Sequence, residues 1–174
     1  ASVGELQSIV PILEKLEEND KIQQVLITSN TLSSSKVLEK LKFKKVIHQF
    51  FPVDNNFLTN KFLDHWQPSM ALFIDSEIWP NMISNLNKKK IPIILLNARI
   101  TKKSFMKWKI LSNFSKKIFS KINLSLASNT LSKNYLKKLG AKNIKLFGNL
   151  KFAQSEKEIV KIDNNFKNFI FSKK

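Results

Sequence analysis

The chain has 174 residues, 43% of them hydrophobic, which is enough for one domain with a buried core. It contains no cysteine, so disulfides and thiolate metal sites are excluded. No apolar run reaches the roughly 18 to 20 residues that span a bilayer.

The net charge of +17 comes almost entirely from lysine, and Arg99 is the only arginine. Such a charge favours anionic partners such as lipid head groups, a phosphorylated substrate or nucleic acid. A lysine-rich composition that reflects an AT-rich genome explains many of the lysines equally well. Specific readout of bases usually depends on arginine forks, so no specific nucleic-acid partner is expected.

Helical and extended segments alternate along the chain. In chain order we expect helix 5–18, strand 25–28, helix 33–41, strand 46–51, helix 54–66, strand 70–74, helix 80–88, strand 91–96, helix 101–119, strand 124–127, a helix from Asn129 or Thr130 to Gly140, and strand 144–147.

Several residues set these boundaries. The serine run that opens helix 33–41 can cap it, as Asp54 and Thr101 can cap the helices that they begin. Pro80 suits a first helical turn. Gly140 suits a helix end. Within helix 54–66 the pattern places Phe57, Phe62 and Leu63 inward.

The alternation predicts an α/β fold with a Rossmann-like, doubly wound parallel sheet. Strand 91–96 is wholly apolar, as a central parallel strand would be. We expect residues 1–152 to form this domain. Residues 153–174 would be a linker and the start of a further domain.

Four short blocks place charged or small residues at the ends of expected strands or the starts of expected helices. Open α/β sheets bind ligands at that edge. The blocks are Ala1-Ser2-Val3-Gly4-Glu5, Asp75-Ser76-Glu77-Ile78-Trp79-Pro80-Asn81, Asn97-Ala98-Arg99 and Gly148-Asn149-Leu150-Lys151-Phe152.

Each charged residue in these blocks has a functional and a structural interpretation. Glu5 can act as a general base, or it can be a common first-turn acid. Asp75 and Glu77 point to opposite sides of an extended segment, so only one faces a ligand, and either can be a capping acid. Arg99 suits phosphate or carboxylate recognition, or an ordinary ion pair. Lys151 can neutralise a departing anion, or it can be a solvated lysine.

In their order and spacing the four blocks resemble the N-terminal half of the Kdo transferases. These GT-B glycosyltransferases transfer 3-deoxy-D-manno-octulosonic acid (Kdo) from CMP-Kdo to the lipid A precursor during lipopolysaccharide synthesis. The resemblance implies an inverting reaction without a metal or a cofactor. It also implies that the N-terminal half binds mainly the acceptor and that CMP-Kdo binds through a C-terminal half, so that this half alone is inactive.

The resemblance assigns roles to particular residues. Glu5 would be the general base, and Asp75 and Lys151 would stabilise the transition state. The acceptor-binding residues would be Ser2, Gly4, Glu77, Asn97 and Arg99. The sequence departs from the family pattern at Asp75, where the family has glutamate, and at Ala153, where it usually has aspartate.

The expected helix 101–119 carries an apolar stripe beside many lysines, and the stripe consists of Phe105, Trp108, Leu111, Phe114 and Ile118. Such a helix can lie on an anionic membrane, or it can pack on the core with a solvated lysine face. With the resemblance, the first interpretation predicts a protein at the cytoplasmic face of the inner membrane, peripheral or anchored by a segment outside this sequence. The alternative function is a non-catalytic basic α/β module that docks on anionic membrane or nucleic acid.

Overall fold

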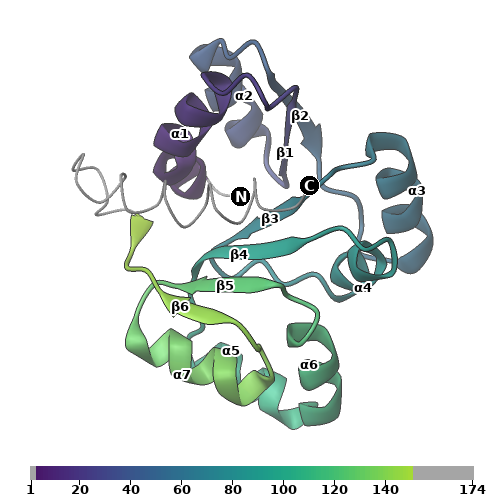
Figure 1. The fold of residues 1–174 in the computed structure, drawn as a ribbon, viewed down its shortest axis with the longest axis vertical. Helices are drawn as coiled ribbons and strands as arrows, with labels where there is room; N and C mark the ends of the chain where they lie inside the picture. Colours follow the sequence, from purple (N-terminus) through teal and green to yellow (C-terminus); the bar gives the residue numbers. More distant parts are fainter. Residues whose placement is uncertain (1–2, 151–174) are drawn as a thin grey trace.

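The computed structural model of the chain describes residues 3–150, so predictions for residues 153–174 lie outside it. Helices and strands alternate as predicted (Figure 1). In chain order the elements are α1 (Val3–Glu17), β1 (Val25–Ser29), α2 (Leu32–Leu41), β2 (Val46–Phe50), α3 (Asn56–Trp66), β3 (Ala71–Ile74), α4 (Pro80–Lys88), β4 (Ile93–Ala98), α5 (Lys102–Ile110), α6 (Ser112–Phe119), β5 (Leu124–Ala127), α7 (Thr130–Leu139) and β6 (Ile144–Leu146).

Every strand pairing in the described part of the chain is parallel, which confirms the predicted α/β class. The strands form two groups rather than one continuous ladder. One group is β1-β2, and the other is β3-β4-β5-β6 (Figure 1). The interruption falls between β1 and β3.

Strand β4 lies between β3 and β5, and all six of its residues are buried. It is therefore the central strand of the fold. Its side chains alternate between two apolar clusters, as the two-residue period of a strand requires. Ile93 and Leu95 join a cluster with residues of α3 to α7, whereas Ile94 and Leu96 join one with residues of α1, α2 and β1. Helices therefore cover both faces of the sheet, as in a doubly wound fold.

Most of the predicted helix boundaries are confirmed. Pro80 occupies the first turn of α4. The side chains of Thr101 and Asn129 accept hydrogen bonds at the starts of α5 and α7, and Gly140 ends α7 in the left-handed region at φ 103°. The serine run does not cap α2, because the N-cap is Thr31, whose side chain makes no capping bond to a backbone N–H.

The prediction that Asp54 caps the helix at 54–66 is wrong. The N-cap of α3 is Asn55. The Asp54 carboxylate instead accepts hydrogen bonds from the backbone N–H groups of Asn81 (3.1 Å) and Met82 (2.8 Å), in the first turn of α4. Phe57 was predicted to point inward but is 74% exposed, because Thr59 and Leu63 form the buried side of α3 and Phe57 projects about 200° around the helix from Thr59.

The predicted long helix at 101–119 is two helices. The backbone leaves the helical region at Leu111, with φ −102° and ψ 52°, and α6 starts at the next residue. Phe105 and Ile118 are buried as expected, whereas Leu111 and Phe114 are exposed. The break turns the middle of the apolar stripe toward the surface.

Alanine at the two left-handed glycines should separate backbone strain from steric conflict. A Cβ at Gly140 would lie 2.9 Å from Cα of Lys116, whereas one at Gly148, with φ 98°, would meet nothing within 4 Å. We expect Gly148→Ala to lower the free energy of unfolding by about 1 kcal/mol through strain alone, and Gly140→Ala to lower it by about 2 kcal/mol or more. Chemical denaturation measures both, and equal losses would contradict this account.

Candidate functional site

Three of the four sequence blocks meet at the carboxyl ends of the parallel strands. Asp75 directly follows β3, Asn97 lies near the end of β4, and Gly148 follows β6 closely. The register of β3 and β4 pairs Ile74 with Leu96, so Asp75 and Asn97 are the next opposed positions. Ligands of open α/β sheets bind at this edge.

A hydrogen bond joins the side chains of Asp75 and Asn97. The Asn97 Nδ2 group donates to Oδ1 of Asp75. Both residues adopt the left-handed region, with φ 56° at Asp75 and 52° at Asn97. Among non-glycine residues, Asp and Asn tolerate this conformation best. An aspartate at position 75 therefore suits this backbone better than the glutamate of the family pattern would.

The same Asn97 amide reaches the block that begins at Gly148. Its Oδ1 atom accepts a hydrogen bond from the backbone N–H of Leu150 at 3.3 Å. Asn97 is only 3% exposed, and both polar atoms of its amide are engaged by protein groups. Asn97 thus connects Asp75 to the residue that precedes Lys151. Its contact with an acceptor stays a prediction.

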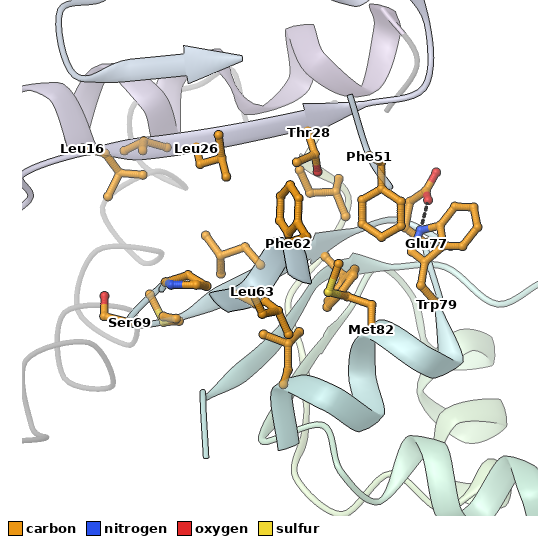
Figure 2. A pocket seen from close by; sticks show the side chains of 18 of the residues that line it. Leu16, Leu26, Thr28, Phe51, Phe62, Leu63, Ser69, Glu77, Trp79 and Met82 are labelled. Atoms are coloured by element: carbon orange, nitrogen blue, oxygen red, sulfur yellow. Dashed lines mark hydrogen bonds between the residues drawn. The ribbon is translucent and has the colours of Figure 1, made fainter. Parts of the chain in front are cut away.

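Glu77 and Asp75 have different neighbours, as expected for residues two apart on an extended segment. Oε2 of Glu77 accepts a hydrogen bond from Nε1 of Trp79 at 2.5 Å, and the Trp79 ring packs against Phe51 at 4.9 Å between centroids. Glu77, Trp79 and Phe51 line a groove together with Thr28, as Figure 2 shows.

The Arg99 side chain is exposed and forms no salt bridge with a carboxylate of residues 3–150. Among the described residues, Arg99 therefore does not form the ordinary ion pair that was one interpretation of it. Its backbone is fixed instead, since Arg99 N–H donates to the Asp75 carbonyl (3.3 Å) and its own carbonyl accepts from Oγ of Ser76 (2.5 Å). This clamp holds the Arg99 backbone beside Asp75, and its exposed side chain can bind an anionic ligand.

Glu5 lies half-buried in the first turn of α1, where the helix dipole favours a carboxylate. Its carbonyl accepts a hydrogen bond from Oγ of Ser8 at 2.6 Å. A Cβ at Gly4 would meet nothing within 4 Å, so the glycine leaves open space at this helix end. Ser2 and Lys151 lie outside the described residues.

A polar pair between β1 and β2 was not predicted from the sequence. Oγ of Ser29 and Nε2 of His48 lie 2.8 Å apart, and the His48 ring meets Phe50 edge to face. Burial lowers the pKa of His48 below its ordinary 6.5, opposed by nearby Glu39. The partly shielded imidazole therefore favours its neutral form, which suits a structural hydrogen bond. No group of three or more His, Asp or Glu residues in the described chain could hold a metal ion.

Comparison with known proteins identifies the family. The family model of 3-deoxy-D-manno-octulosonic-acid transferase (kdotransferase) matches residues 1–154. The chain belongs to the Kdo transferase family. The match spans the complete set of four blocks, including those that meet at Asp75 and Asn97.

Individual relatives agree with this assignment. The 3-deoxy-D-manno-octulosonic acid transferase of Rickettsia bellii is 32% identical over 97% of the chain, and that of Rickettsia prowazekii is 36% identical over 90%. That of Haemophilus influenzae is 26% identical over 87% of the chain. The chain spans 41%, 34% and 36% of the lengths of these three Kdo transferases, respectively.

Several parts of the site could not be read from the sequence. The backbone clamp between Ser76 and Arg99, and the amide bridge from Asn97 to Leu150, join residues that are 23 and 53 positions apart. The register of β3 and β4 brings the first pair together, and the registers of β4, β5 and β6 bring the second pair together. The sequence pattern that could have predicted the site is that polar residues follow consecutive apolar strands.

Substitution of Asn97 should distinguish its side-chain bridge from its backbone conformation. Asn97→Gly keeps the left-handed backbone and removes both hydrogen bonds, so we expect the free energy of unfolding to fall by about 1–3 kcal/mol. Asn97→Ala also imposes strain and should cost about 1 kcal/mol more. Chemical denaturation measures both variants. If Asn97→Gly is as stable as the parent chain, the bridge contributes nothing to stability.

Proposed function

We propose that this chain is the acceptor-binding half of a GT-B Kdo transferase, which transfers Kdo from CMP-Kdo to the lipid A precursor. The observation that supports the proposal most is the network Asp75–Asn97–Leu150 at the carboxyl edge of the sheet, since it gathers three of the four family blocks. The family match spans the same blocks. The relatives are two to three times longer than the aligned region, so the donor site is proposed to lie in the remaining length.

The proposed chemistry is an inverting displacement at the anomeric carbon of Kdo. Glu5 removes the proton of the acceptor hydroxyl, whose oxygen forms the new glycosidic bond while the bond to the CMP phosphate breaks. The Asp75 carboxylate stabilises positive charge that develops on the sugar ring. Lys151 neutralises the phosphate of departing CMP. Ser2, Gly4, Glu77, Asn97 and Arg99 form or support the acceptor site, and no metal or cofactor takes part in the proposed reaction.

Acceptor recognition is proposed to depend on Arg99 and on the general basic charge of the domain. The Arg99 guanidinium is exposed beside the Asp75 segment, and a planar fork suits the phosphates of the lipid A precursor. A bound phosphate near Arg99 would place the sugar hydroxyls over the carboxyl ends of β3 and β4. That placement would bring the reacting hydroxyl toward the carboxylates at this edge.

Replacement of Glu5 tests the proposed general base. In the full-length protein, Glu5→Gln should lower kcat by about 10²–10⁴-fold and leave the Kd for the lipid A precursor within a fewfold of its original value. Glu14→Gln is the matched control because Glu14 is exposed on the same helix. Transfer from CMP-Kdo measures kcat. Undiminished turnover in Glu5→Gln would disprove the assignment of the base.

A second observation supports docking on a membrane surface. Where α5 meets α6, exposed apolar side chains lie among exposed lysines. The apolar residues are Met106, Ile110, Leu111 and Phe114, and the lysines are Lys102, Lys103, Lys107, Lys109, Lys116 and Lys117. Ile110 is the most exposed of the apolar set, at 82%. This combination suits the boundary of an anionic bilayer.

We call these ten residues the α5–α6 surface. Its charge continues toward α4, where burial and the positive charges of Lys88 and Lys117 lower the pKa of Lys121. The described helices include none that is long and apolar enough to cross a bilayer. The exposed apolar side chains and lysines of the α5–α6 surface lead us to propose its peripheral contact with the cytoplasmic face of the inner membrane. A purely docking role would use the same surface without catalysis.

Vesicle binding separates these possibilities. At physiological salt, the chain should co-sediment more strongly with vesicles that contain lipid A precursor than with charge-matched phospholipid vesicles. Ile110→Ser should weaken binding to both by about tenfold, since burial of one isoleucine contributes roughly 1.5–3 kcal/mol. Leu131→Ser is the control, because Leu131 is also an exposed aliphatic residue but lies on α7.

Two results would contradict the proposals in different ways. Equal binding to both kinds of vesicle would exclude a specific acceptor site in this half and leave a non-specific docking module. Equal losses from Ile110→Ser and Leu131→Ser would exclude the α5–α6 surface as the site of membrane contact.

A further inference from the structure

The first turn of α4 is capped by a residue from another part of the chain. Its N-cap, Trp79, makes no side-chain capping bond, and Pro80 has no N–H group. The N–H of Ile83 is already bonded to the carbonyl of Trp79 at 2.9 Å. The first turn therefore leaves the N–H groups of Asn81 and Met82 for a partner from outside the helix.

The Asp54 carboxylate binds both of these donors. Oδ2 accepts the N–H of Asn81 at 3.1 Å, and Oδ1 accepts the N–H of Met82 at 2.8 Å. The contact is reciprocal, because Nδ2 of Asn81 donates to the Asp54 carbonyl at 2.7 Å. A hydroxyl cap has a single oxygen, whereas this carboxylate engages both of its oxygens. The loop after β2 is therefore fixed firmly to the start of α4.

The same loop also contacts the residue that precedes α4. Phe51, which lies just before Asp54, packs its ring against Trp79 at 4.9 Å between centroids. The Trp79 indole N–H in turn donates to Oε2 of Glu77 at 2.5 Å (Figure 2). A continuous chain of contacts therefore runs from the Asp54 loop through Trp79 to a carboxylate of the proposed acceptor site.

Glu77 depends on these contacts because it lies outside the regular elements. It follows β3 and precedes α4, and its N–H bonds to the carbonyl of Ile74 at 3.2 Å. Its side chain is partly buried and is held by the Trp79 indole. A free glutamate side chain samples several conformations. A side chain that is held in one orientation before a ligand arrives lowers the entropic cost of binding.

The charge of Asp54 also limits what the start of α4 can bind. A helix N-terminus at the carboxyl edge of a parallel sheet commonly binds phosphate, since its free N–H groups and its dipole attract anions. At α4 a carboxylate of the chain itself takes those N–H groups. The occupied helix end disfavours a ligand phosphate. Uncharged sugar hydroxyls can instead donate to the Glu77 carboxylate, and phosphates remain better suited to the exposed Arg99.

We propose that Asp54 is a positioning residue of the acceptor site. It fixes the start of α4, and through Trp79 it holds the Glu77 carboxylate ready to accept hydrogen bonds from sugar hydroxyls of the acceptor. Asp54 acts through the protein, because α4 engages both of its carboxylate oxygens. This inference rests on the proposed function, which places Glu77 in the acceptor site.

Two substitutions at the contact between the loop and α4 test the proposal. Asp54→Ala removes the cap of the first turn. Asn85→Ala is the matched control, because the buried Asn85 amide donates from the next turn of α4 to the carbonyl of Asn56 (3.1 Å) and to the hydroxyl of Thr59 (2.8 Å). Both variants of the full-length protein should unfold at lower denaturant concentration than the parent, but only Asp54→Ala should disturb Trp79 and Glu77.

The indole N–H resonance of Trp79 reports on the held side chain. In full-length protein with isotope-labelled tryptophan, Trp79→Phe assigns this resonance, and Trp108 of α5 is the internal reference. We expect Asp54→Ala to shift the resonance and to speed its exchange with water by about tenfold or more, and Asn85→Ala to leave it unchanged. An unchanged Trp79 resonance in Asp54→Ala, or equal changes in both variants, would overturn the proposal.

Affinity for the lipid A precursor supplies the second readout. Asp54→Ala and Glu77→Gln should each raise its Kd by about tenfold, and the double variant should be little worse than either, since both changes affect one interaction. Asn85→Ala should leave the Kd unchanged. A parental Kd in Asp54→Ala, or an equal increase in Asn85→Ala, would overturn the proposal. Absence of precursor binding by the parent protein would refute the proposed function, and the Trp79 resonance would still decide this inference.

Discussion

The burial of β4 on both of its faces is the constraint on which the other elements depend. Ile93 to Leu96 are each at most 1% exposed, and each contributes roughly 1.5–3 kcal/mol when removed from water. A strand with two apolar faces requires helices on both, which forces α1 and α2 to one side and α3 to α7 to the other. Because both faces of β4 are covered, solvent and ligands reach it only at its ends, and polar residues lie there.

The arrangement at the carboxyl edge follows from that position. Asn97 is one of the few buried polar residues in the described chain, and an amide in such a place must have its hydrogen bonds satisfied. The Asn97 amide forms its hydrogen bonds with the Asp75 carboxylate and the backbone N–H of Leu150. These bonds hold the segment after β3 and the segment after β6 in place relative to each other. The left-handed backbone at Asp75 and Asn97 has an energetic cost, which a well-packed surrounding must offset. Backbone strain of this kind is common where proteins hold reactive groups in place.

The sequence predicted the features that depend on local chemistry. Proline in the first turn of α4, asparagine before α7, and glycine after it each act within one turn of helix. It failed where a distant partner decided the outcome. Asp54 binds backbone N–H groups at the start of α4, 27 residues away, and Asn55 caps α3 instead. At Leu111 the helical pattern continues in the sequence, but the backbone turns and no local residue signals it. The site was predictable as a set of strand ends, whereas its bonds depend on strand register.

The break at Leu111 changes how the chain can meet a lipid surface. A continuous amphipathic helix would lie flat and displace head groups along its whole length. The break instead gathers the exposed side chains of Ile110 and Leu111 at the junction of two short helices, which is a much smaller contact than a continuous helix would make. Such a contact occupies a small area in the plane of the membrane. If the proposed membrane contact is made here, insertion depends on gaps between neighbouring head groups, and therefore on lipid packing and curvature more than on the total area of bilayer available.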